Sequence, residues 1–353
     1  MIRDEYSPYK IIHHENKLKE LRGGLDSVPL LVQLIPTNKC NRICRNCAYR
    51  IKGHVSNQTF CDTDYLNYEK IKECVYDFKR MGVRAVEITG GGEPLVHPKI
   101  LNVFKEIMNL KLDLALVSNG IKLNDEICEL LGETSWVRIS VDAVNADTYK
   151  LIGGGPIERF DKVIKNIKTL VQYRKSVIIG IGFVVQKENW EQIYEAAKFF
   201  KEIGVNNFRI SAAFTPEKYK YFNGFMERAT ALAYEASTLT DENFTVFNLF
   251  NDRIQDTFVG RQHYDYCPSK DLITYVGADA NVYTCCTLAY NKLGLIGSIK
   301  NQSFFDLWNS ADKRNMFKNH NPLKHCRVPC LYRNKNYFIN YCIKQNPRHI
   351  NFI

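Results

Sequence analysis

The strongest constraint on the fold of this chain is a regular alternation of short apolar runs and amphipathic helical patterns between residues 30 and 212. Between the runs, apolar residues recur at helical spacing, most clearly from Phe160 to Val171. Strands that alternate with helices pair in parallel and are covered by those helices. Six apolar runs are predicted to form buried strands, at 30–35, 84–89, 113–118, 136–141, 177–185 and 207–212.

Six strand–helix units predict an α/β fold but are too few for a complete eightfold barrel. A partial (β/α)6 barrel and a doubly wound sheet both fit the pattern, and each places its site at the carboxyl ends of the strands. Outside these units the alternation stops. We expect an N-terminal segment at 1–29, the partial barrel at 30–213, a helical connection at 214–266 and a small cysteine-rich C-terminal extension at 267–353.

Composition and charge exclude several classes of protein. The 353 residues are 45% hydrophobic and 24% charged, as in a globular protein. No apolar run approaches the ~18 residues of a membrane span, so no membrane partner is expected. The polar start lacks the apolar core of a signal peptide, which favours a cytoplasmic location. The net charge of +10 can attract an anionic substrate, but no basic block is dense enough to predict a nucleic-acid groove.

Twelve cysteines in a chain expected in the reducing cytosol favour metal binding over disulfides. Three of them, Cys40, Cys44 and Cys47, fall within eight residues just after the first predicted strand. Short loops of this kind let several sulfurs reach one iron–sulfur cluster. Three thiolates leave one iron of a [4Fe–4S] cluster open, and the next cysteine is Cys61. A zinc site and chance clustering are the alternatives, although zinc sites usually combine paired C-x2-C units.

The spacing C-x3-C-x2-C after a first strand resembles that of the radical S-adenosylmethionine (radical SAM) superfamily. The resemblance implies that Cys40, Cys44 and Cys47 hold a catalytic [4Fe–4S] cluster, with S-adenosylmethionine chelated to its open iron. Reductive cleavage of that cofactor gives a 5′-deoxyadenosyl radical, with electrons from a flavodoxin or ferredoxin type of donor. One residue departs from the family pattern. Asn46 stands where an aromatic side chain often lies near the adenine, and Tyr49 is an alternative for that contact.

Polar residues at the ends of later strands resemble the cofactor-binding segments of the same superfamily. The turn Thr89–Pro94 looks like the GGE motif, which binds the amino group of the cofactor. Arg209 and Ser211 are expected to face the same mouth, whereas Arg138, in the middle of the fourth strand, is interpreted as structural. Taken singly, such residues are also ordinary strand-end turns. The expected cofactor-binding residues are Gly91, Gly92, Glu93, Ser118, Asn119, Ser140, Asp142 and Asn189.

A second group of six cysteines lies in the last third of the chain. The segment 273–285 alternates like a hairpin that ends in Cys285, which brings Cys285 close to Cys267. Cys326 and Cys330 can complete a four-thiolate site, although Cys286 or Cys342 could displace one member. Zinc is the alternative metal.

This layout resembles the SPASM/twitch extensions of the radical SAM superfamily, which carry auxiliary [4Fe–4S] clusters. Two departures from their pattern are visible. Ala280 replaces a usual glycine, and the C-x2-C-x5-C-x3-C run is missing. We therefore expect one auxiliary [4Fe–4S] cluster, held by Cys267, Cys285, Cys326 and Cys330.

The resemblance implies abstraction of a hydrogen atom from a small-molecule or peptide substrate. An electron passed to the auxiliary cluster would make the net reaction an oxidation, whereas a thiol such as Cys286 or Cys342 could return a hydrogen atom and give epimerisation. The short segment before the first strand favours a sugar, cyclitol or nucleotide-like substrate over a peptide, as does the basic tail. The alternative of another class is a non-catalytic zinc or iron–sulfur binding protein.

Overall fold

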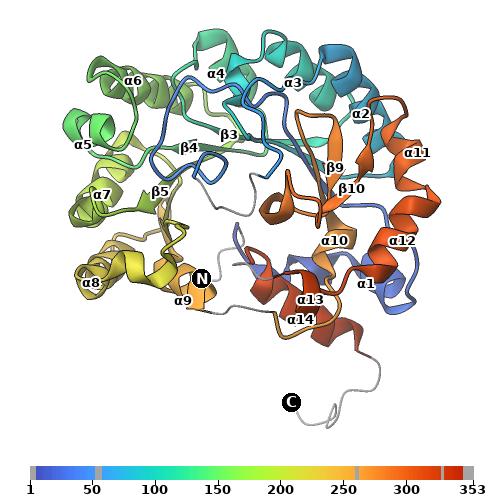
Figure 1. The fold of residues 1–353 in the computed structure, drawn as a ribbon. Coiled ribbons are helices and arrows are strands. Elements are labelled where there is room, and N and C mark those ends of the chain that lie inside the picture. The colour runs from blue at the N-terminus through green and yellow to red at the C-terminus, as the bar shows by residue number, and fades with distance from the viewer. Residues whose placement is uncertain (1–4, 52–57, 259–261, 327–329, 345–353) are drawn as a thin grey trace.

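The computed structural model of the chain describes residues 5–51, 58–258, 262–326 and 330–344 (Figure 1). Within those ranges no helix has both the length and the apolar character that crossing a membrane requires.

A single ten-stranded sheet organises the described residues, in the order β10-β9-β8-β1-β2-β3-β4-β5-β6-β7. Neighbouring strands from β8 through β1 to β7 are all parallel. The six predicted strands are confirmed, two with the predicted bounds (β3 and β6) and four one or two residues shorter. They are β1 (Leu31–Leu34), β2 (Ala85–Ile88), β3 (Asp113–Ser118), β4 (Trp136–Ser140), β5 (Ile178–Val185) and β6 (Asn207–Ala212).

Four further strands extend the sheet at its two ends. The hairpin of β8 (Ile273–Val276) and β9 (Asn281–Tyr283) is the predicted one, and β10 (Leu295–Ser298) continues it in antiparallel fashion. The parallel pairing of β8 with β1 was not predicted, because it joins strands far apart in the chain. Strand β7 (Thr245–Asn248) was not predicted either, because this four-residue strand has no extended apolar run.

Helices cover the outer face of the curved sheet and form the arc visible in Figure 1. Their burial follows the apolar spacing in the sequence, and asparagine side chains cap several N-termini, such as Asn67 and Asn124. These helices are α2 (Tyr68–Met81), α3 (Ile100–Asn109), α4 (Asp125–Leu131), α5 (Ala146–Leu151), α6 (Glu158–Gln172), α7 (Ile193–Ile203), α8 (Met226–Ser237) and α9 (Phe250–Phe258). Short 3-10 turns lie between them, η3 (Pro94–Val96), η4 (Trp190–Gln192) and η5 (Lys218–Phe222).

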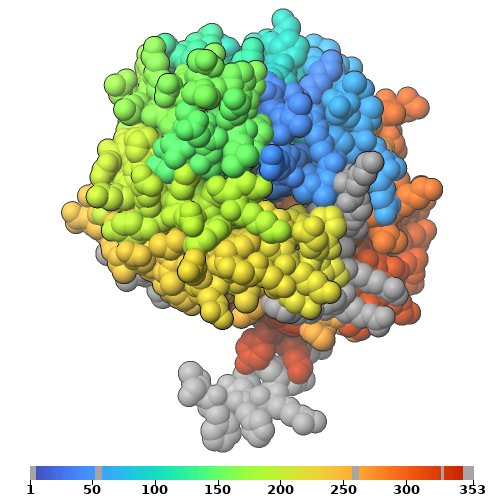
Figure 2. Space-filling view, turned by 60° about the vertical axis from the view of Figure 1, so that its left-hand side comes forward, coloured from blue at the N-terminus to red at the C-terminus, as the bar shows by residue number. Residues whose placement is uncertain are grey.

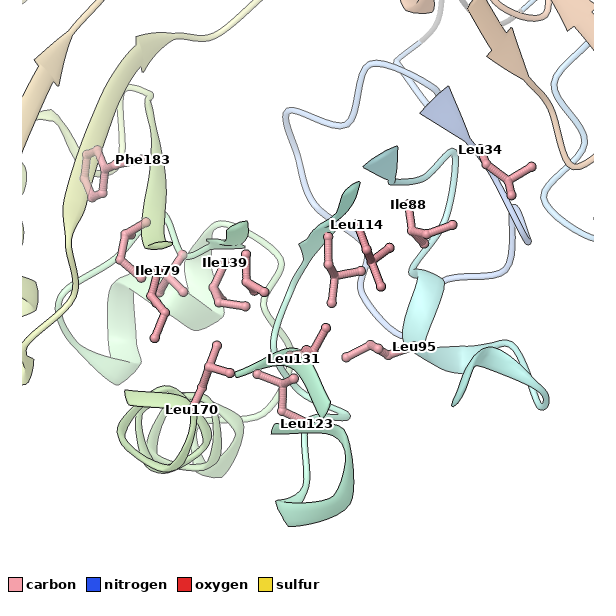
Figure 3. Close-up of a cluster of buried hydrophobic side chains, with 14 of the residues drawn as sticks. Leu34, Ile88, Leu95, Leu114, Leu123, Leu131, Ile139, Leu170, Ile179 and Phe183 are labelled. Carbon is pink, nitrogen blue, oxygen red and sulfur yellow. The ribbon is translucent and has the colours of Figure 1, made fainter. Parts of the chain in front are cut away.

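The main hydrophobic core lies between this helical layer and the outward side chains of the strands (Figure 3). Leu34, Ile88, Leu116 and Ile139 are fully buried there. Burial of this apolar surface is the main stabilising term for the barrel.

Elements near both ends of the described chain lie on the side of the barrel away from the helical arc (Figure 1). The early elements η1 (Pro8–His13) and α1 (Glu15–Arg22) pack against α14 (Arg333–Ile343). A small separate core that includes Leu21, Leu272 and Ile339 joins these elements. The other C-terminal elements are α10 (Ser269–Leu272), η6 (Cys286–Leu288), α11 (Phe304–Trp308), α12 (Ala311–Asn319) and α13 (Pro322–His325).

The inner face of the sheet differs from the outer one. Along β2, β4 and most of β6, burial alternates: the outward residues are buried, and the inward residues Glu87, Arg138 and Arg209 stay partly exposed. Helices cover the outward residues, so the exposed fraction of these inward side chains lies within the barrel. The barrel interior is therefore partly accessible and carries charge.

Candidate active site

The first cysteine loop lies at the carboxyl end of β1, where the parallel fold predicts a site. A turn from the Cys47 N–H to the Cys44 carbonyl (3.3 Å) brings these two residues together. The Arg42 N–H approaches the Cys40 sulfur at 3.5 Å. Burial raises the pKa of the Cys44 thiol to about 11, and the Cys47 and Cys40 thiols act in the same direction. The three predicted sulfurs are thus close enough to influence one another.

Two glycines fix the position of this loop. The Gly92 N–H donates to the Thr37 carbonyl (3.2 Å), and a Cβ on Gly92 would clash with the backbone of Lys39. On the other side, the Ile43 N–H donates to the Gly153 carbonyl (3.3 Å), where φ is +88°. In Figure 2 the blue segment that holds the cysteine loop adjoins the green segment around residue 153. This contact joins residues 110 positions apart, so no local sequence pattern indicates it.

The Glu93 carboxylate holds the ends of two strands together. It is buried and accepts hydrogen bonds from the Ser118 hydroxyl (2.7 Å), the Asn119 N–H (2.8 Å) and the Leu95 N–H (3.1 Å). Burial raises its pKa, and these three donors oppose that shift. A direct contact between this carboxylate and a cofactor ammonium stays a prediction, and in the structure its oxygens already have partners within the chain.

Other predicted cofactor-binding residues connect the cysteine loop to later strands. Asn119 Nδ2 donates to Asn41 Oδ1 (2.7 Å), and Arg42 Nη1 donates to the Ser140 carbonyl (3.1 Å). The Asp142 carboxylate accepts from the Val184 N–H (2.8 Å) and from Asn46. The structure therefore brings these residues together at one end of the barrel, as predicted.

Asn189 is buried and supports the neighbouring strand ends. Its Nδ2 donates to the carbonyls of Asp142 (2.8 Å) and Val184 (2.9 Å), and its Oδ1 accepts from the Gln186 N–H (2.7 Å). A direct contact with adenine or ribose stays a prediction for this residue.

The donor set of the loop fits a [4Fe–4S] cluster with one open iron. Cys40, Cys44 and Cys47 are partly exposed, whereas Cys61 lies outside the group and contacts the Thr63 hydroxyl (3.0 Å). Cubane clusters are held by cysteine thiolates, and three of them leave a coordination position for a small molecule.

The tail cysteines form a second group. Cys267, Cys285, Cys326 and Cys330 line one pocket, and Tyr332 lines it as well. Burial raises the pKa of the Cys285 thiol, and the Cys286, Cys330, Cys267 and Cys326 thiols follow as further causes. The structure therefore brings the four predicted thiols together, and their role as cluster ligands stays a prediction.

Two tail cysteines, Cys286 and Cys342, do not line this pocket. Cys342 is on α14, where its carbonyl accepts from Arg22 Nη2 (2.8 Å). Cys286 contacts the Tyr332 hydroxyl (3.5 Å) and packs against an inner aromatic cluster with Tyr275 and Tyr290.

Inner side chains connect the two cysteine groups. The Tyr49 hydroxyl, two residues beyond Cys47, hydrogen-bonds the Tyr275 hydroxyl (3.1 Å). Burial raises the pKa of Tyr49, and the Cys286 thiol and then the Cys47 thiol add to the shift. Tyr49 is thus within electrostatic reach of Cys47 in the first loop and of Cys286, the residue next to Cys285 in the chain. In the structure Tyr49, the residue suggested as an alternative adenine contact, packs in the inner aromatic cluster.

A second connection was not foreseen. The Tyr332 hydroxyl donates to Gln33 Oε1 (3.3 Å), and Gln33 Nε2 donates to Glu87 Oε1 (3.2 Å). Gln33 is the one polar residue of the apolar run LLVQLI, a signal that it faces inward from β1. Nothing in the local sequence of Tyr332 indicates this contact, because it joins residues about 300 positions apart.

Comparison with known protein families agrees with this geometry. The model of the Radical SAM superfamily matches residues 34–216, just over half of the chain. The model of the SPASM iron–sulfur cluster-binding domain matches residues 267–331. Together these matches support a catalytic [4Fe–4S] cluster, S-adenosylmethionine and an auxiliary iron–sulfur cluster as cofactors.

Among curated proteins, the chain is similar to a tungsten-containing aldehyde ferredoxin oxidoreductase cofactor-modifying protein of Pyrococcus furiosus. The two are 29% identical over 52% of this chain and 51% of that protein. A probable GTP 3',8-cyclase of Thermococcus kodakarensis is 30% identical over 46% of this chain and 51% of its own length. The chain thus spans about half the length of these curated relatives.

Among solved structures, the fold is similar to that of SuiB from Streptococcus suis bound to its precursor peptide SuiA. The TM-score is 0.63 at 17% identity, over 98% of this chain and 83% of the other. The structure of anSMEcpe with bound AdoMet gives a TM-score of 0.59 at 19% identity, over 82% and 83%. These similarities confirm a partial barrel with a C-terminal SPASM extension, and they exclude the doubly wound sheet.

Proposed function

Because the chain belongs to the radical SAM superfamily, we propose that it abstracts a hydrogen atom from a peptide substrate held inside the barrel. The observation that carries this proposal is the position of Tyr49, two residues beyond Cys47. Its hydroxyl hydrogen-bonds Tyr275 (3.1 Å) in the inner aromatic cluster, against which Cys286 also packs. A substrate between the two cysteine groups would face both the radical source and the auxiliary site. Glu87, Arg138 and Arg209 line that space and are partly exposed.

Each group of residues has a distinct part in this proposal. Cys40, Cys44 and Cys47 would hold the first cluster, which with S-adenosylmethionine supplies the 5′-deoxyadenosyl radical. The backbone of Gly91 and Gly92 would orient that cofactor, with Ser118, Asn119, Ser140, Asp142 and Asn189 shaping its pocket. Glu93 would act by fixing the ends of β2 and β3. Cys267, Cys285, Cys326 and Cys330 would hold the auxiliary cluster.

A peptide substrate has better support than the sugar, cyclitol or nucleotide-like molecule favoured from the sequence. SuiB, whose fold matches over 98% of this chain, is described with a precursor peptide. The anSMEcpe structures also contain peptides, as in the complex with Cp18Cys peptide. The relatives described as GTP 3',8-cyclases match only about half of this chain.

Two outcomes are open to the substrate radical, and they differ in the electrons and protons that they require. In an oxidation, the substrate radical would lose one electron, which the auxiliary cluster would accept, and one proton to a base. In an epimerisation, Cys286 would give its thiol hydrogen atom to the radical. The resulting thiyl radical would then take one electron from the flavodoxin or ferredoxin type of donor and one proton from water. As the hydrogen-atom donor in an epimerisation, Cys286 suits the barrel interior better than Cys342. Cys286 lies beside Tyr332, whereas Cys342 lies on α14 near Arg22.

Coexpression with short peptides encoded beside the gene tests the substrate class. We expect mass spectrometry to show either loss of two hydrogen atoms, for oxidation, or uptake of one deuterium from D2O without other change, for epimerisation. Cys286→Ser should abolish only the second outcome. Unchanged peptides, combined with 5′-deoxyadenosine release that responds to sugars or nucleotides, would contradict the peptide proposal.

A further inference from the structure

The inner face of the sheet carries positive charge that the described residues around it do not neutralise. Arg138 on β4, Arg209 on β6 and Lys335 on α14 are all partly exposed, and no ion pair joins any of them to a described carboxylate. Two carboxylates, Glu87 on β2 and Asp142 after β4, are electrostatic neighbours of Arg209. Glu87 hydrogen-bonds Gln33 (3.2 Å), and Asp142 accepts from the Val184 N–H (2.8 Å). Among the described residues neither carboxylate forms an ion pair with the three cations, so the interior keeps unpaired positive charge.

Arg209 is the clearest of these unpaired cations. Its Nε is buried and has no hydrogen-bond partner among the described residues. Its guanidinium lies 5.5 Å from the ring centroid of Tyr6, which in turn packs edge-on against Phe247 (4.7 Å). Burial, and next the Arg138 cation, lower the pKa of Arg209 to about 9. An unpaired cation in such surroundings is costly to the fold unless a ligand partner offsets the cost.

Strand β5 leaves room between the two arginines. Gly182 pairs with Ser140 on one side and with Arg209 on the other. A Cβ on Gly182 would touch the Arg138 side chain at 3.4 Å, so Arg138 lies across this glycine. Its guanidinium is 5.6 Å from the ring centroid of Trp136. Both arginines therefore reach the same part of the interior.

The other cations nearby already have partners or suit the role less well. Arg253 pairs with Asp256 (3.0 Å), which also pairs with Arg333 (3.0 Å). Lys335 lies 6.0 Å from the ring centroid of Tyr332, toward the auxiliary pocket. Two guanidinium groups remain, and the planar fork of arginine matches a carboxylate through paired hydrogen bonds.

We propose that Arg138 and Arg209 bind a carboxylate of the substrate, supplied by an acidic residue of the peptide. Only the identity of the ligand, a carboxylate on a peptide, rests on the proposed function. The anion site itself depends only on the unpaired arginines. It would hold the substrate at a fixed position relative to both cysteine groups.

Binding of small probes to the reconstituted holoenzyme tests the site without turnover. Glutarate carries carboxylates, glutaramide is its neutral counterpart, and inorganic phosphate represents a phosphorylated small molecule. We expect glutarate, but not glutaramide, to bind and to raise the melting temperature. Arg209→Gln and Arg138→Gln should each weaken glutarate binding about tenfold or more, and Arg314→Gln, at an exposed position, should not.

Stability separates a binding role from a structural one. Without a probe, Arg209→Gln should melt at the parent temperature or above it, because an unpaired cation is removed. Absence of glutarate binding in the parent, or equal binding by Arg209→Gln, would overturn the proposal. Phosphate binding tighter than glutarate would overturn the carboxylate assignment. Glutarate binding with no peptide ever modified would contradict the peptide substrate and leave the anion site standing.

Discussion

At the scale of single residues, the cysteine loop packs so closely against Gly92 that no side chain fits at this position. Gly92 lies against the backbone of Asn38 and Lys39, and the Glu93 N–H donates to the Lys39 carbonyl (2.9 Å). The glycine turn and the loop thus form one packed unit. A methyl group between them must push the thiols away from their positions.

Gly92→Ala should therefore damage the site more than the fold. Overpacking of this kind costs about 1–3 kcal/mol of unfolding free energy, and we expect a lower iron content after reconstitution. Gly23→Ala is the matched control. Its φ of −80° is ordinary and its Cβ would meet neighbours at 3.4 Å. Denaturant unfolding and iron analysis check both variants, and an iron content equal to the parent in Gly92→Ala would contradict the packed unit.

A single histidine gives the barrel a dependence on pH. His97 is buried between β2 and α3, its Nε2 faces the Leu66 carbonyl (3.0 Å), and its ring stacks on Tyr65. Burial lowers the pKa of His97 below its ordinary value of 6.5. The folded state therefore resists protonation of His97. Neutral His97 contributes fully to stability above its ordinary pKa of 6.5, and that contribution is lost as the pH falls through the lower pKa of the folded state.

We expect the unfolding free energy to decline as the pH falls from 7 toward 5, and His97→Gln to flatten part of that decline. Urea titrations of both proteins across this range check the expectation. An unchanged pH profile in the variant would show that His97 is not the group responsible.

At the scale of elements, the C-terminal extension and the barrel form one packed body. β8 pairs with β1, and α11 packs on α2 through Phe304 and Phe78, whose rings meet edge to face at 4.9 Å. Trp308 Nε1 donates to the Ser27 carbonyl (3.0 Å), which adds the N-terminal segment. The auxiliary site is therefore held in a fixed position relative to the first cysteine loop.

Phe304→Ala should destabilise the whole molecule and not the extension alone. Loss of a fully buried phenylalanine costs about 3–5 kcal/mol, and we expect a single unfolding transition at lower denaturant concentration. Tyr234→Ala on α8, at a residue 62% exposed, should change stability by less than about 0.5 kcal/mol. Separate transitions, with the barrel unaffected, would contradict the single packed body.

At the scale of the whole molecule, local patterns and long-range pairings were predictable to different extents. The six central strands and the thiols of both groups follow from periodicity and spacing, which are properties of short segments. The pairing of β8 with β1 and the contact between Tyr332 and Gln33 join distant segments, so no local pattern indicates them. The hydrogen-bond partners of Glu93 and Asn189 were not predicted, because a motif gives the position of a residue in the sequence and not the direction of its side chain.

The iron content of three proteins tests the central claim, that two separate thiolate sites serve one barrel. After anaerobic reconstitution the parent should bind about eight irons per chain, because each [4Fe–4S] cluster holds four. The variant with Cys40, Cys44 and Cys47 changed to Ala should bind about four. The variant with Ala at Cys267, Cys285, Cys326 and Cys330 should also bind about four, held by the first loop. Stoichiometric zinc in the parent, or full iron content in either variant, would contradict the account.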